Sequence, residues 1–292
     1  MTTTRPFDLR AARAMRDGLD PYHALIVFSP ASVGVFAGAG LDPWAAYFAG
    51  RSAPLGAASE GLVDAIFFHF EPGMVAAQMA KVRAAAEPDK LLALRLEAAA
   101  AAARDTLGEE VIGSAEMAEA AELAVTAAAA CTAAGRPLGA ANAALPLPDA
   151  PHLRLWQAAT TLREWRGDGH NAALLASGMD AVEVLVNAVA AGVERRESIQ
   201  PRRGWSDAAW EAAEQRLHAR GLLTEDGGLT LRARELREEI EDLTDRLALA
   251  PWQALGRDGT RRLHELVLPW SAVVSDRFLA KLRLRPAPFP EA

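Results

Sequence analysis

Apolar side chains recur every three or four residues along most of the chain, which is the spacing of amphipathic helices. In the clearest example, Leu236, Ile240, Leu243 and Leu247 follow one another at intervals of four, three and four. Glycine and proline interrupt the pattern at short intervals and set the helix ends. The pattern predicts a mainly α protein, with helices at 8–18, 21–28, 30–36, 43–50, 59–70, 73–86, 89–107, 114–134, 152–165, 171–189, 206–219, 231–249, 257–267 and 270–282.

One stretch has the pattern of a β-hairpin. The segments 222–224 and 229–231 are apolar, and between them lies the turn sequence Glu225-Asp226-Gly227-Gly228. The order helix, hairpin, helix over 206–249 is that of a winged helix. The succession of short helices over 8–86, joined by tight turns, has the form of a second helix-turn-helix core. We therefore expect tandem winged-helix or helix-turn-helix-like lobes, with one small β-hairpin wing.

The proline- and glycine-rich stretch 135–150 is the predicted linker between the lobes. An N-terminal helix-turn-helix-like lobe then covers 1–134, and a C-terminal winged-helix-like lobe covers 151–292. The N-terminal lobe ends in an alanine-rich helical hairpin, 89–134. Because alanine lets helices approach closely, this hairpin either packs its own lobe or forms a homodimer interface.

A compact polar group lies between two of the predicted helices. Gly167 and Gly169 are expected to break the chain there, so that Arg166, Asp168 and His170 are held at a bend. Asp168 could orient His170 or pair with Arg166, which would suit a ligand carboxylate or proton transfer. The alternative is structural: Asp168 caps the following helix, and Arg166 extends along the surface.

A second candidate site lies among the aromatic residues of the N-terminal half. His23, Tyr47 and Arg51 are the polar groups of a predicted pocket with an aromatic lining. The alternative is that these apolar stripes form core. A single haem-ligating histidine, His170 or His23, also stays open, although no cofactor is predicted. Catalytic residues are not assigned.

Charge, cysteine content and the absence of common motifs exclude several classes of function. The formal charge of −7 gives no overall attraction to nucleic acid or anionic lipid. One cysteine, Cys131, excludes an intramolecular disulfide, and no metal-ligand spacing or phosphate-binding loop is present. Residues 1–10 lack the apolar segment of a signal peptide, and no apolar run reaches about 18 residues. We expect a soluble cytoplasmic protein without a membrane segment.

Two resemblances support the fold. Residues 205–249 resemble the recognition helix, wing and following helix of a MarR-type winged helix, through Leu217, Gly221-Leu222-Leu223, Gly228-Leu229-Thr230, Arg234 and Leu236. The whole chain resembles an actinobacterial helix-turn-helix family of unknown activity. The segments that carry this second resemblance are 47–56, 165–170 and 251–256.

The resemblance implies a DNA-binding regulator as one function, with Arg202, Arg203, Arg216 and Arg220 on the phosphates. However, helix 206–219 carries Asp207, Glu211 and Glu214, and the wing tip carries two more carboxylates, which repel a phosphate backbone. DNA is therefore the less favoured partner. The leading hypothesis is a small-molecule-binding or ligand-processing protein on a repurposed winged-helix fold. Its pocket is expected between the lobes and lined by Arg166, Asp168, His170, His23, Tyr47 and Arg51.

Overall fold

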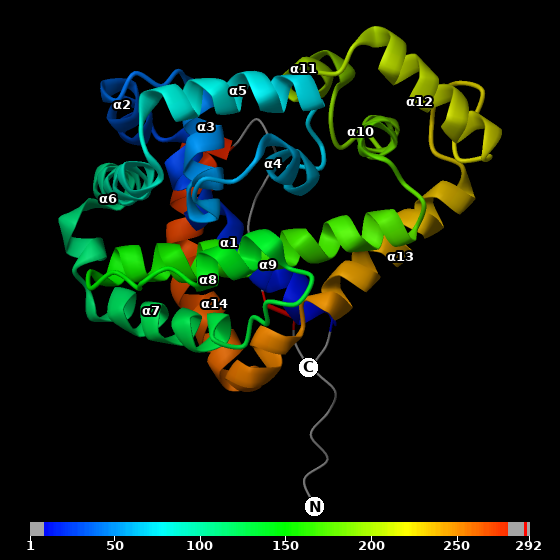
Figure 1. Ribbon diagram of the computed structural model, residues 1–292. Helices are drawn as coiled ribbons and strands as arrows, with labels where there is room; N and C mark the ends of the chain where they lie inside the picture. Colours follow the sequence, from blue (N-terminus) through cyan, green and yellow to red (C-terminus); the bar gives the residue numbers. More distant parts are fainter. Residues whose placement is uncertain (1–8, 280–288, 291–292) are drawn as a thin grey trace, which may run out of the picture. The chain divides into compact units, whose positions relative to one another are not determined.

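The computed structural model describes residues 9–279 and 289–290 (Figure 1). In this part of the chain the secondary structure is helical and no β-strand forms, so the prediction of a mainly α protein is confirmed. The contacts group the chain into two compact units. Unit 1 comprises Met1–Ala57, Lys81–Asp168 and Asp245–Ala292, and unit 2 comprises Ala58–Ala80 and Gly169–Thr244. Both units are discontinuous in sequence, unlike the lobes predicted on either side of 135–150.

Unit 1 contains most of the helices. They are α1 (Leu9–Phe28), α2 (Pro30–Gly38), α3 (Pro43–Ser52), the short 3-10 helix η1 (Ala53–Leu55), α6 (Pro88–Ile112), α7 (Ala115–Ala128), α8 (Pro137–Ala143), α14 (Ala250–Val274) and the π-helical turn η2 (Ser275–Leu279). Three further helices are divided between the units: α5 (Pro72–Ala85), α9 (Pro151–Ala176) and α13 (Leu231–Leu247).

Helix α1 packs along α14, and glycine permits the close approach. The Cβ of an added side chain at Gly18 would lie 3.1 Å from Cδ2 of His264. The hydroxyl of Ser271 donates to the carbonyl of Gly18 at 2.6 Å. The sequence predicted a helix end at Gly18 and a new start at Pro21, which is wrong, because α1 continues through both residues. Packing against α14 outweighs the helix-breaking tendency of one glycine and one proline.

Helix α8 lies inside the predicted linker 135–150 and corrects it. Leu138, Gly139 and Asn142 are buried, so this segment belongs to the core of unit 1. A Cβ at Gly139 would lie 2.6 Å from Cα of Trp165 in α9. The glycine that suggested a flexible connector instead allows two helices to pack backbone against backbone.

The C-terminal helices also differ from their predicted bounds. Helix α14 begins at Ala250 and reaches Val274, with a kink at Gly256 (φ 75°) and with Pro269 inside it. The predicted helices 257–267 and 270–282 are therefore parts of α14 and the following turn. Residues 280–282 of the second prediction lie outside the described residues.

Unit 2 is built on a helix-turn-helix. Its helices are α4 (Glu60–Ile66), α10 (Ala181–Ala190), α11 (Arg196–Arg203) and α12 (Asp207–Ala219), with parts of α5, α9 and α13. Gly204 adopts a left-handed conformation (φ 81°) in the turn between α11 and α12, and Ser206 caps α12. Trp210, Ala213 and Leu217 of α12 are fully buried in the core. The apolar spacing predicted no helix between 189 and 206, whereas α11 occupies Arg196–Arg203.

The β-hairpin wing does not form as two strands. A single antiparallel bridge joins Leu223 to Leu229, and Thr224 N–H donates to the carbonyl of Gly228 at 2.8 Å. Thr230 N–H also donates to the carbonyl of Leu222 at 3.3 Å, while its hydroxyl accepts from Ala233 N–H and caps α13. Since α13 begins at Leu231, the returning strand has no further residues to pair.

Among the described residues, no single helix has both the length and the apolar composition of a membrane span. Two bent pairs, α1 with α2 and α9 with α10, meet those criteria only when each pair is counted as one segment.

Candidate functional site

The predicted bend at Gly167 and Gly169 is wrong. Helix α9 runs without interruption from Pro151 to Ala176, and neither glycine has a positive φ. A helical glycine costs about 1 kcal/mol relative to alanine, which tertiary contacts along the helix outweigh. Successive residues of a helix are rotated by about 100°, so Arg166, Asp168 and His170 do not converge on one point as they would at a bend.

Arg166 binds a buried carboxylate of unit 1. Its Nη2 lies 2.6 Å from Oδ1 of Asp245, whose side chain is completely buried. Arg13 of α1 holds the other oxygen, with Nη2 at 2.7 Å from Oδ2. One aspartate therefore fixes two arginines, and Arg166 keeps a defined position inside the protein.

Asp168 is buried against α8. Its Oδ2 accepts a hydrogen bond from Gly139 N–H at 2.8 Å. Burial raises the pKa of this carboxyl to about 6, and the hydrogen bonds from the Gly139 and Leu138 amides only partly offset this effect. Asp168 therefore does not cap a helix that starts at Gly169; it anchors α8 to α9.

The raised pKa predicts a pH dependence of stability. Because the folded state binds the Asp168 proton more tightly than the unfolded chain, its contribution falls as the pH rises from about 4 to about 6. Asp168→Asn should remove this fall. At pH 7 the free energy of unfolding of the variant should be equal to that of the wild type or higher by up to about 2 kcal/mol. Urea unfolding of both proteins from pH 4 to pH 7.5 measures it. Asp258→Asn, at a fully exposed ion pair, is the control; an unchanged slope in Asp168→Asn would contradict the assignment.

His170 lies in unit 2 and points to α13. Its Nδ1 is 2.9 Å from the hydroxyl oxygen of Thr244, which itself donates to the carbonyl of Ile240 at 2.7 Å. Because the threonine proton is used there, His170 Nδ1–H donates to the threonine oxygen. The ring also stacks on His69, with centroids 6.5 Å apart. The partner of His170, Thr244, directly precedes Asp245, which binds Arg166, whereas Asp168 is bound by Gly139 of α8.

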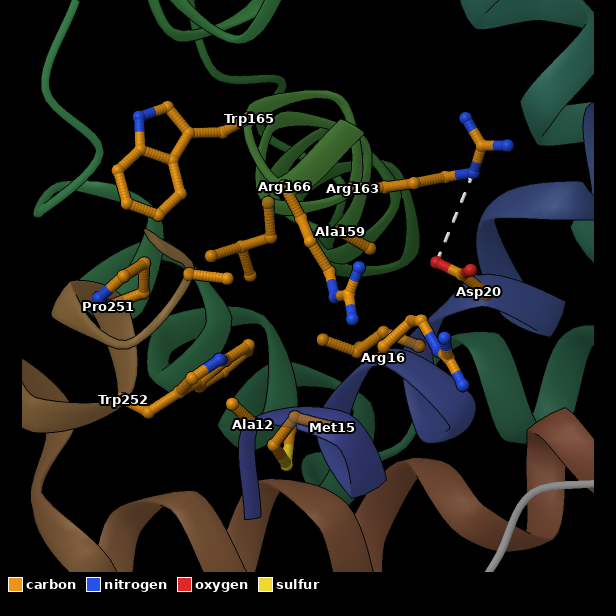
Figure 2. Close-up of a pocket in the computed structure, with 13 residues that line it drawn as sticks. Ala12, Met15, Arg16, Asp20, Ala159, Arg163, Trp165, Arg166, Pro251 and Trp252 are labelled. Atoms are coloured by element: carbon orange, nitrogen blue, oxygen red, sulfur yellow. Dashed lines mark ion pairs between the residues drawn. The ribbon is translucent and has the colours of Figure 1, made fainter. Parts of the chain in front are cut away.

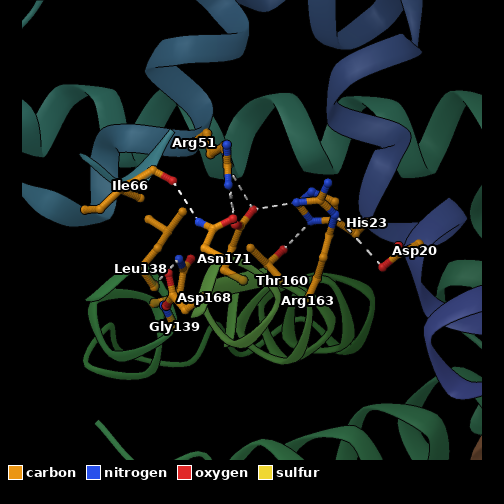
Figure 3. Close-up of polar contacts among 12 residues, drawn as sticks. Asp20, His23, Arg51, Ile66, Leu138, Gly139, Thr160, Arg163, Asp168 and Asn171 are labelled. Carbon is orange, nitrogen blue, oxygen red and sulfur yellow. Dashed lines mark hydrogen bonds and ion pairs between the residues drawn. The ribbon is translucent and has the colours of Figure 1, made fainter. Parts of the chain in front are cut away.

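The second predicted set is gathered around a residue that the sequence reasoning missed. Glu164 of α9 is 97% buried, since 3% of its side chain is exposed, and it accepts from Arg51 Nη2 at 3.1 Å and from Arg163 Nη1 at 2.7 Å (Figure 3). Burial alone would raise its pKa, but the two arginines outweigh burial and hold the pKa at about 2. Tyr47 hydrogen-bonds Arg51, and the charge of Glu164 also acts on His23. We call these five residues the Glu164 cluster.

His23 is buried and its tautomer is fixed. Its Nδ1 lies 2.9 Å from the hydroxyl of Thr160, which donates to the carbonyl of Trp156 at 2.8 Å. Nδ1 must therefore carry the proton. Burial lowers the pKa of His23 well below its ordinary value, and the Arg163 charge acts in the same direction. The ring is neutral at pH 7 and stacks on Trp156.

A pocket of unit 1 adjoins this cluster through Arg163. Figure 2 shows Arg16, Asp20 and Arg163 on one side of the lining and Pro251 and Trp252 on the other, with Arg166 extending between them. Its free volume is about 20 Å³, which admits about one water molecule. We call it the arginine pocket. Its lining is Ala12, Met15, Arg16, Leu19, Asp20, Ala159, Leu162, Arg163, Trp165, Arg166, Ala248, Pro251 and Trp252.

One signal in the sequence could have revealed Glu164. Thr160, Glu164 and Asp168 are spaced by four, so they share one face of a continuous helix. Polar residues at this spacing indicate a polar stripe along one face of the helix. The expected break at Gly167 obscured it.

The arginines predicted to contact DNA are held within unit 2. Arg216 binds Asp180 at 2.6 Å and Glu183 at 3.1 Å, and Arg220 binds Glu183 at 2.8 Å. Arg202 pairs with Glu194 at 2.9 Å, and Arg203 stacks on Phe70 with its Cζ 4.4 Å from the ring centroid. Each of these four arginines therefore already has a partner within unit 2.

The comparisons with known proteins agree with the fold of unit 2. A family model described as a helix-turn-helix family matches residues 12–280, which is most of the chain. The chain therefore belongs to this helix-turn-helix family. No curated protein and no solved structure matches it.

Proposed function

We propose that the protein binds a small acidic molecule with an apolar body in the arginine pocket. The observation that carries the proposal is the composition of the lining. Arg16, Arg163 and Arg166 face it, against the single carboxylate of Asp20, and the remaining residues are apolar or aromatic. Such a pocket favours a carboxylate over a neutral or cationic group on the same body.

The arginines differ in exposure. Arg166 is held by Asp245 and has 13% of its side chain exposed. Arg16 and Arg163 are about a third exposed, at 31% and 36%. Arg16 pairs with the adjacent Asp17, whereas Arg163 pairs with the adjacent Glu164 and also lies 3.9 Å from Asp20. Because the free volume admits only about one water, a ligand enters by displacing the outer side chain of Arg16, while Arg163 and Arg166 stay in place.

Benzoate, benzyl alcohol and benzylamine are matched probes, because they share a ring and differ in charge. We expect benzoate to bind most tightly and benzylamine least. Arg16→Gln should weaken benzoate about tenfold, since one hydrogen bond to a charged group contributes about 1.5 kcal/mol, and should leave benzyl alcohol unchanged. Isothermal titration calorimetry measures all three affinities.

Arg261→Gln is the matched control, because Arg261 is exposed, pairs only with Asp258 within the described part of the chain and does not line the pocket. Equal affinity for the three probes would refute the proposal. So would an equal loss of benzoate binding in Arg16→Gln and Arg261→Gln, which would indicate a general charge effect.

DNA binding is the second candidate, and the family membership together with the turn between α11 and α12 favours it. In a MarR-type arrangement α12 would enter the major groove. The pair between Arg216 and Asp180 opposes this weakly, because both side chains are about half exposed and a phosphate can replace the carboxylate. The pairs of Arg216 and Arg220 with the buried Glu183 oppose it more, because their loss would leave a buried carboxylate uncompensated. Stronger opposition comes from Asp207, Glu211, Glu225 and Asp226, which are exposed on α12 and at the turn before α13.

Binding to mixed genomic fragments at 50 and 200 mM salt separates the two functions. A DNA-binding protein would lose affinity steeply with salt and would lose it in Arg202→Gln/Arg216→Gln. The ligand-binding proposal expects neither result and expects the benzoate preference instead.

A further inference from the structure

A second charged group lies deep in unit 1, outside the arginine pocket. Arg95 projects from α6 and is 2% exposed. Its Nη2 donates to Oδ1 of Asn142 in α8 at 2.6 Å, and its Cζ lies 4.8 Å from the ring centroid of Trp156 in α9. Asn142 is itself oriented by a hydrogen bond from its Nδ2 to the carbonyl of Leu138. A neutral amide and an aromatic face are therefore the partners of this guanidinium.

Most of the donor capacity of Arg95 is unused. Its Nε and Nη1 are buried and have no hydrogen-bond partner in the protein. Among the described residues no carboxylate lies within ion-pair distance of it, and Glu164, whose charge does act on it, is bound by Arg51 and Arg163. Burial lowers the pKa of Arg95 to about 10, so the group still carries its charge at pH 7.

An unpaired charge in the interior is costly, whereas a paired one is tolerated. A water molecule could accept from Nε or Nη1 but would not neutralise the guanidinium. A small anion does both, and because Nε and Nη1 are fully buried, a small ion that needs only slight repacking is favoured over a larger ligand. We infer that Arg95 holds a small monovalent anion of the chloride type at its Nε and Nη1 side. This inference does not depend on the arginine pocket, because Arg95 does not line it.

The anion predicts a specific dependence of stability on chloride. Ionic strength is held constant while gluconate, which is too large for the site, is replaced by chloride. The melting temperature of the wild type should rise by equal steps for each tenfold increase in chloride above the dissociation constant. Arg95→Met should show no such rise, and Arg104→Met, at an exposed position of the same helix, should behave as the wild type.

The two curves should also cross. Without chloride, Arg95→Met should be at least as stable as the wild type, because methionine removes an uncompensated charge. At high chloride the wild type should be the more stable protein. Parallel curves for the wild type and Arg95→Met would overturn the inference.

Bromide provides a direct readout that needs no variant. Crystals of the wild-type protein grown in sodium bromide should show an anomalous peak within hydrogen-bond distance of Arg95 Nε or Nη1. A water molecule there, or no density, in a crystal that binds bromide elsewhere would refute the site. This result decides the matter even if Arg95→Met does not fold.

Discussion

Glu164→Gln should lower the free energy of unfolding by about 3–5 kcal/mol, the range for breaking a buried ion pair by removing one partner. The loss is large because Glu164 compensates two arginines at once, Arg51 and Arg163, and Arg51 is mostly buried beside it. Glutamine keeps the shape and one acceptor, but it no longer compensates the charge of Arg51. Chemical denaturation at pH 7 measures the change.

Acid unfolding provides a second readout of the same group. The folded-state pKa of about 2 lies below the ordinary value of 4.5, so the stabilisation is present above about pH 4.5 and is lost as the pH falls towards 2. Glu164→Gln should lack this loss. Glu122→Gln is the control, since Glu122 pairs with Arg154 at the surface and is 65% exposed. A change below about 1 kcal/mol in Glu164→Gln, as expected for surface pairs, would contradict the role of the cluster.

Gly139→Ala should cost about 3 kcal/mol or more, which is at the upper end for overpacking a core. The new Cβ would lie 2.6 Å from Cα and 2.8 Å from Cβ of Trp165, so the backbones of α8 and α9 must separate. That movement also stretches the hydrogen bond from Gly139 N–H to Asp168. The melting temperature and near-ultraviolet circular dichroism of the variant measure the loss.

Gly34→Ala is the matched control, because no atom lies within 4 Å of a Cβ at this exposed position inside α2. There alanine should stabilise by up to about 1 kcal/mol through its higher helix propensity. Similar effects of the two substitutions would show that contact with Trp165 does not decide the result.

Local sequence patterns predicted elements well where the apolar spacing is regular and the caps are strong. The helix expected at 206–219 corresponds to α12 with Ser206 as its cap, and the one expected at 231–249 corresponds to α13. The prediction of a helix-turn-helix protein is confirmed by the family match. The expected wing is reduced to one bridge, because α13 begins at Leu231 and leaves the returning strand no further residues to pair.

Glycine and proline misled the prediction at several sites, because their local preference is weaker than tertiary packing. Gly18 and Pro21 lie inside α1, and Gly167 and Gly169 lie inside α9. Gly139 and the neighbouring prolines indicated a linker, whereas the glycine is needed for a close helix contact. Long-range geometry of this kind leaves no trace in the spacing of apolar residues.

The residues of the candidate site were likewise predicted only in part. His23, Tyr47 and Arg51 were chosen for their aromatic surroundings, and the structure groups them around Glu164. Arg166, Asp168 and His170 were chosen for a bend that is absent, and only Arg166 reaches the arginine pocket. The sequence does not reveal the roles of Glu164 and Arg95, because these depend on partners about 47 to 113 positions away.

Because α9 is uninterrupted, the exact number of its residues is as important as its composition. Thr160, Glu164 and Asp168 reach His23, Arg51 and Gly139 from one stripe, while Arg166 reaches Asp245 from another. Inserting one residue near Ala158 would turn every later side chain by about 100° and shift it by 1.5 Å. All these partnerships would fail together, so among natural variants this helix should accept exchanges of side chains but no insertions or deletions.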